Sequence, residues 1–180
     1  MGVEMRKTIA MLTVCFAVVL GVGTPAVADS DARPFKGSVS GELAFVPVDA
    51  ELCPQSELLF GSLKTAATAT GTFTHLGKSR MTAEHCTPAG DVITGGEMTL
   101  VAANGDVIYV EYAGMIPFPG PEVQIGDVFS GDLEFTIVGG TGRFDDAAGE
   151  GTITAYVTFG GFESPDWPGA RWTYEGTISY

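Results

Sequence analysis

Glycines interrupt two strand-like runs at one point of the chain and limit how those runs can connect. An apolar run over residues 128–138 ends at Gly139, Gly140 and Gly142, and a second run over residues 152–159 follows a short acidic loop. Glycine has no Cβ, so it permits positive φ and close approach of two backbones. The pattern therefore predicts a tight corner between two long antiparallel strands, with no helix between them. We therefore expect the three glycines to have a structural role and not to contact a ligand.

Strand-like segments alternate with turns from residue 35 onward. Within residues 35–45, apolar and polar side chains alternate, which is the period of a half-buried strand. Asn104-Gly105 is a strong hairpin signal between two such segments. The expected strands are residues 35–45, 65–75, 78–86, 97–103, 106–113, 128–138, 152–159 and 171–180. This order predicts an all-β fold, a single antiparallel β-barrel of about eight strands closed between its first and last strands, with a β-sandwich as the alternative.

The corner carries a family resemblance. The order apolar strand, GGTGRF over residues 139–144, acidic loop, A-x-G-x-G, strand resembles the corner of dirigent proteins and of the allene oxide cyclase barrel superfamily. Residues 71–77, 100–106 and 174–180 are similar to further turn landmarks of exported bacterial proteins of that kind. The resemblance implies a barrel with an apolar interior, in which allene oxide cyclases close a fatty-acid-derived epoxide and dirigent proteins steer phenoxy radical coupling. It carries over no catalytic residue, because the shared motifs are turns and corners.

The first 28 residues are typical of a cleaved signal peptide. Arg6 and Lys7 precede an apolar core over residues 8–22, and Ala26-Val27-Ala28 supplies a cleavage site. The core is short for a membrane span, although an uncleaved anchor is the alternative. We therefore expect an exported protein, secreted or held in the periplasm or cell envelope. Its mature chain, residues 29–180, would form one domain without a membrane span.

Two cysteines follow the expected cleavage site, Cys53 and Cys86. An even number of cysteines in an exported protein favours a disulfide. Closing this loop would stabilise the fold by about 3–4 kcal/mol in the chain-entropy description. Two free thiols or a catalytic cysteine are the alternatives, but no basic neighbourhood that would stabilise a thiolate is visible.

The charge of the chain excludes one large class of partner. The formal net charge is −13 at pH 7. Binding to nucleic acid relies on clustered Lys and Arg side chains, so we expect no nucleic-acid partner. Anionic membrane surfaces are disfavoured for the same reason.

The two histidines are His75 and His85. Glu84, His85 and Cys86 look like a metal site, but neighbours on a strand point to opposite faces, so the three cannot converge on one ion without a bulge. We expect no metal and no cofactor. His75 lies where a strand enters a turn and is a candidate general acid or base, although a histidine there more often hydrogen-bonds the backbone.

Aromatic residues gather near the end of the chain, where Trp172 and Tyr174 share one face of the last expected strand. Such a stripe usually packs in a core, but in a hollow barrel it would line a small-molecule site. Tyr109, Glu111 and Glu134 are further candidates for the interior. A carboxylate in an apolar cavity has a raised pKa and can serve as an acid or base, although outward placement is the expected one for both glutamates.

Three functions stay open on the sequence alone. The leading one is a non-catalytic exported module that binds a small apolar or aromatic ligand in the barrel, or a surface partner. The second is a cofactor-free isomerase or cyclase of allene oxide cyclase type, and the third is a structural, envelope-associated protein. A cavity without a buried ionisable group would favour binding, and an inward Glu134, Glu111 or His75 would keep the enzyme hypothesis open. A lumen filled by Phe and Trp side chains would leave only surface roles.

Overall fold

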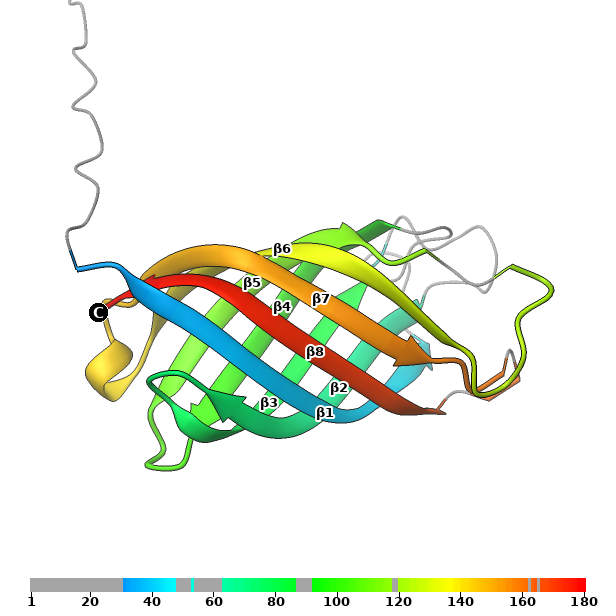
Figure 1. The fold of residues 1–180 in the computed structure, drawn as a ribbon, viewed down its shortest axis with the longest axis horizontal. Helices are drawn as coiled ribbons and strands as arrows, with labels where there is room; N and C mark the ends of the chain where they lie inside the picture. Colours follow the sequence, from blue (N-terminus) through cyan, green and yellow to red (C-terminus); the bar gives the residue numbers. More distant parts are fainter. Residues whose placement is uncertain are drawn as a thin grey trace, which may run out of the picture.

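Eight strands close into one antiparallel barrel, in which each strand pairs with its neighbours in the chain and β8 pairs with β1 (Figure 1). The computed structural model describes residues 31–47, 53, 63–86, 92–117, 120–161, 163–164 and 166–180, so the expected signal peptide, residues 1–28, lies outside it. The strands are β1 (Arg33–Pro47), β2 (Leu63–Phe73), β3 (Gly77–Cys86), β4 (Val92–Ala102), β5 (Val107–Met115), β6 (Val128–Gly140), β7 (Ala148–Thr158) and β8 (Asp166–Ser179). The predicted all-β barrel of eight strands is confirmed, and the β-sandwich is excluded.

Alternation of side chains decides which face of each strand lines the interior. In β2, Ala67, Ala69 and Phe73 are buried, whereas the threonines between them are exposed. In β8, Trp172 and Tyr174 are buried and Arg171 and Glu175 are exposed. A period of two places alternate side chains on opposite faces, so each strand contributes one apolar row to a shared core.

Strand β4 begins earlier than the sequence predicted, because a bulge carries it across a glycine pair. The pairing of β4 with β5 shifts between Ile93 and Gly96, and Gly95 there has a φ of 59°. A Gly-Gly pair ordinarily ends a strand, but glycine in αL also accommodates a bulge within one. The glycine pair therefore lies inside the sheet.

Strand β8 also begins earlier than residue 171, where the sequence predicted its start. It includes Trp167 and Pro168, and its pairing with β1 shifts between Gly41 and Leu43. Proline lacks the N–H that a regular ladder requires, and it is tolerated where pairing is interrupted. The shift lets Trp167 join the interior as part of β8.

The glycine corner joins β6 to β7 at the end of the barrel where β1 starts and the chain ends (Figure 1). A single turn of 3-10 helix, η1 (Gly142–Phe144), lies in the corner, where the sequence predicted no helix. A Cβ on Gly140 would collide with the Val107 carbonyl oxygen and lie 2.6 Å from that of Phe144, and Gly142 has a φ of 63°. Both positions therefore favour glycine.

No helix among the described residues is long and apolar enough to cross a bilayer.

Aromatic rings fill the half of the barrel next to this corner, which we call the corner end. Phe35 stacks on Phe73 with ring centroids 5.4 Å apart, and Phe73 meets Tyr174 edge-on at 4.8 Å. Phe144 is fully buried against Tyr180, with ring centroids 4.9 Å apart. This half of the interior is packed core, so space for a ligand must be sought at the opposite end.

Candidate functional site: a cavity at one end of the barrel

A cavity of about 70 Å³, partly open to the outside, lies at the opposite end, which we call the cavity end. It is formed where β1, β3, β5 and β7 finish and where β2, β4, β6 and β8 begin. The lining residues are Leu43, Phe45, Thr65, Ala67, Ala83, His85, Val92, Ile93, Met98, Tyr112, Ile116, Phe129, Leu133, Ile153, Val157, Trp167 and Trp172. The walls are thus apolar and aromatic, and none of these described residues carries a fixed charge.

A hydrogen-bonded pair, His85 of β3 and Tyr112 of β5, supplies the main polar groups of the cavity. His85 Nδ1 lies 2.8 Å from the Tyr112 hydroxyl oxygen, and the two rings meet edge to face with centroids 5.7 Å apart. Strand β4 runs between them, and its Gly96 lies directly opposite Tyr112. A Cβ on Gly96 would come within 2.6 Å of the Tyr112 ring. The absence of a side chain at Gly96 therefore leaves the space in which the pair forms.

Both members of this pair are uncharged near neutral pH. Burial lowers the pKa of His85 from 6.5 to about 4, because the charged imidazolium loses its hydration inside the barrel. Burial and, to a smaller extent, the negative charge of Glu84 raise the pKa of the Tyr112 phenol. The cavity therefore offers hydrogen bonds without offering charge.

Tyr174 separates the cavity from the packed half of the barrel. Its hydroxyl oxygen lies 3.1 Å from Met81 Sδ and 3.4 Å from Met98 Sδ, deep in the interior, so its single hydrogen has a thioether acceptor on either side. Burial, followed by the nearby Tyr112 phenol, raises the pKa of Tyr174 well above its usual value. Met98 lines the cavity, so this buried contact forms part of its floor.

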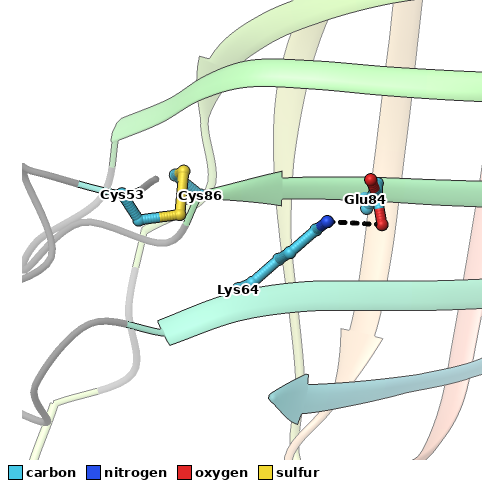
Figure 2. Close-up of a disulfide and its surroundings, with 4 residues drawn as sticks. All are labelled: Cys53, Lys64, Glu84 and Cys86. Carbon is cyan, nitrogen blue, oxygen red and sulfur yellow. Dashed lines mark ion pairs between the residues drawn. A yellow bond between two sulfur atoms is a disulfide. The ribbon is translucent and has the colours of Figure 1, made fainter. Parts of the chain in front are cut away.

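A disulfide fixes the end of β3 directly after His85. Cys53 and Cys86 are joined, with Cα atoms 5.3 Å apart, which confirms the predicted pairing (Figure 2). Glu84 leaves the same strand on the outer face, where Lys64 Nζ lies 2.6 Å from its carboxylate (Figure 2). Glu84, His85 and Cys86 thus have three separate sets of contacts. Over the described part of the chain, no three His, Cys, Asp or Glu side chains form a group that would hold a metal ion.

The three residues singled out as catalytic candidates lie away from the cavity. Glu111 and Glu134 are exposed on the outer face of the barrel, which is the placement expected for both. His75 lies at the corner end with a φ of 68°, and its Nε2 donates to the Pro34 carbonyl at 3.0 Å. The His75 carbonyl in turn accepts from Arg143, whose Nη2 is 2.6 Å away. Its contacts are those of a residue that ties a turn to the start of β1.

The three residues singled out for ligand binding are divided between different regions. Trp172 lines the cavity, and Tyr174 lies in the core beneath it. Tyr109 is on the outer surface, with 43% of its area exposed, so it does not line the interior. The structure thus brings one of the three to the cavity, and its indole lies among the lining aromatic residues.

Reasoning from the sequence did not single out the His85–Tyr112 pair as a site. The alternation of side chains along a strand already placed His85 and Glu84 on opposite faces, and it does the same for Tyr112 and Glu111. What the sequence did not show was that the two residues lie on either side of one glycine. The signal that would have found them is the Gly95-Gly96 pair, because glycine within a strand marks a bulge or the close approach of another group.

Comparisons of the chain with protein-family models, with curated proteins and with solved structures found no match. A barrel fold by itself does not specify a function, so function must be argued from the cavity.

Proposed function

We propose that this protein is an exported barrel that binds one small, uncharged, largely apolar or aromatic ligand at its cavity end. The observation that carries the proposal is an apolar cavity that contains a neutral histidine–tyrosine pair. Small-molecule sites combine such walls with a few polar groups that fix the orientation of the ligand. His85 and Tyr112 supply those groups, and both tryptophans of the chain, Trp167 and Trp172, line the cavity.

The size and chemistry of the cavity narrow the ligand class. At about 70 Å³ the cavity is well below the volumes of roughly 300–1,000 Å³ that drug-sized ligands occupy. It would therefore hold one ring or a short branched group, while the rest of the ligand projects through the open side. A charged group would lose hydration without finding an opposite charge among the described lining residues, which favours a neutral ligand.

Export and family membership belong to the same proposal. The Arg6–Lys7 start, the apolar core and the Ala28 cleavage site support export, and the disulfide is typical of oxidising compartments. The eight-stranded antiparallel barrel and the corner over residues 139–144 support a place in the allene oxide cyclase-like and dirigent-like superfamily. Sequencing the amino terminus of the exported protein tests the first part. A start at Asp29 is expected, and a retained residue 1–28 segment would contradict it.

A cofactor-free isomerase or cyclase is the second candidate, because the cavity contains an ionisable pair. A neutral imidazole held in an apolar site can polarise a substrate carbonyl, as a general acid or electrophile does. Conversion of a bound ligand to an isomer by the wild-type protein, and not by His85→Asn, would show that the protein is an enzyme rather than a binding protein.

A purely structural, envelope-associated role is the third candidate, and it would be favoured if the cavity binds nothing.

Tryptophan fluorescence tests the binding function directly, because both tryptophans line the cavity. Titration of the mature protein with benzyl alcohol, a neutral aromatic probe, is expected to change the emission saturably and to raise the melting temperature. Ala83→Phe places a ring in the cavity and should abolish both effects. Ala113→Phe adds the same ring on the exposed face of β5 and should leave both intact. A response that Ala83→Phe does not alter would show that the probe binds elsewhere.

A further inference from the structure

The direction of the His85–Tyr112 hydrogen bond carries a further conclusion about the ligand. Tyr112 has one hydroxyl hydrogen, and its only hydrogen bond among the described residues is with His85 Nδ1. If Nδ1 carried the ring proton, the Tyr112 hydrogen would have no acceptor in the described structure. That tautomer would also leave the Nε2 lone pair without a donor. If Tyr112 donates to Nδ1 instead, the proton of the neutral imidazole is on Nε2, and the Nε2 hydrogen is the one group of the pair without a described partner. The arrangement with fewer unpaired groups therefore has the proton on Nε2.

The second ring nitrogen of His85 is then an N–H donor without an acceptor among the described residues. Nε2 makes no hydrogen bond within the described residues, and no described side-chain nitrogen or oxygen is fully buried without a partner. Nε2 thus keeps contact with the open space beside it, and His85 lines the cavity. Trp172, another lining residue, adds an indole N–H, which also can only donate.

We propose that the cavity selects neutral ligands that carry a hydrogen-bond acceptor, such as a ketone, ester or lactone carbonyl, on a small apolar or aromatic body. The carbonyl oxygen accepts from His85 Nε2–H, while the ring or alkyl group packs on the aromatic walls. This inference rests on the proposed binding function and adds the class of ligand. The absence of charged groups among the described lining residues disfavours carboxylates, because such an ion would lose hydration without meeting an opposite charge.

The affinities of two probes of nearly the same shape test this proposal. Acetophenone presents a carbonyl oxygen, and in α-methylstyrene a methylene group replaces that oxygen. We expect calorimetric titration of the wild-type protein to give an affinity for acetophenone about threefold to tenfold higher, the range expected for one net hydrogen bond. Benzoate, of similar size but charged, should bind more weakly than either probe.

Two variants test whether His85 causes the difference in affinity between the two probes. The double variant His85→Phe/Tyr112→Phe keeps both rings but removes the His85 N–H together with the Tyr112 hydroxyl, which would otherwise lose its acceptor and become a new donor, so the two probes should bind with affinities within about twofold. His75→Asn changes the other histidine, at the corner end, and should leave the discrimination as in wild type. Asparagine is chosen because His75 has a φ of 68°, a conformation that asparagine tolerates.

The possible failures can be told apart. If both probes bind wild-type protein equally, the ligand class is wrong while the binding function stands. If neither probe binds, the proposed function fails and the ligand class fails with it. If acetophenone is favoured equally by wild-type protein and by the folded double variant His85→Phe/Tyr112→Phe, the donor is another group and the assignment to His85 is overturned.

Discussion

His85 Nδ1 and the Tyr112 hydroxyl oxygen lie 2.8 Å apart, although their strands, β3 and β5, are separated in the sheet by β4. The two side chains meet above Gly96 of β4, and a Cβ there would come within 2.6 Å of the Tyr112 ring. The polar centre of the cavity is therefore built from two rings and one missing side chain. Each part of this arrangement can be changed separately.

Gly96→Ala tests the role of the missing side chain. The added methyl group should push the Tyr112 ring away from His85 and lower the free energy of unfolding by about 1–3 kcal/mol, the usual cost of overpacking a core. Urea unfolding measures the loss. Gly120→Ala, at an exposed position with no atom within 4 Å of the added Cβ, is the matched control and should be close to neutral. Equal stability of the two variants would show that the space above Gly96 is not needed.

His85 should make stability depend on pH in a defined window. Its pKa is about 4 in the folded protein and 6.5 ordinarily, so between these values the unfolded chain binds a proton that the folded chain does not. Its contribution is therefore constant above pH 6.5, and stability falls as the pH drops from 6.5 to 4, by up to about 3 kcal/mol. His85→Gln lacks this titration, whereas both proteins share the carboxylates. The difference between their unfolding free energies, measured in urea at stepped pH, should change across that window, and parallel curves would contradict the assignment.

The disulfide should stabilise the fold without being needed for the barrel pairing. Cys53 and Cys86 are 33 residues apart, and a loop of that size corresponds to about 3–4 kcal/mol in the chain-entropy description. The double variant Cys53→Ser/Cys86→Ser should lose about that amount in urea unfolding while keeping the circular dichroism of a β protein. Alkylation of two thiols in oxidised wild-type protein would refute the pairing.

Gly140→Val tests the glycine corner. A side chain there meets the Val107 and Phe144 carbonyl oxygens, so the corner has to open. We expect a loss of about 1–3 kcal/mol in the free energy of unfolding and a lower yield of folded protein. Probe binding at the cavity end should persist in the fraction that folds. A variant that melts like the parent but no longer binds the probe would show that the corner contributes to binding rather than to folding.

Local patterns were enough to predict the barrel, and the site required knowledge of register. Alternation in β2 and β8 fixed which residues face inward, because a period of two is visible within one strand. The His85–Tyr112 contact depends instead on how three strands align across a bulge, which no single segment records. His75 attracted attention because it lies at the end of a strand, but its contacts with Pro34 and Arg143 are structural. In the sequence, only the Gly95-Gly96 pair indicated where His85 and Tyr112 could meet over β4. A glycine pair more commonly signals a turn, so it was not interpreted in this way.

The histidine nitrogens provide the most direct measurement of the central claim, because the chain contains only His75 and His85. Nitrogen-15 NMR of histidine-labelled protein reports the tautomer and the pKa of each ring separately. We predict that His85 is neutral with its proton on Nε2 until the pH approaches 4, and that acetophenone shifts its Nε2 resonance while that of His75 stays unchanged. A His85 ring that titrates near pH 6.5 and does not respond to the probe would contradict the account of a neutral donor in a ligand-binding cavity.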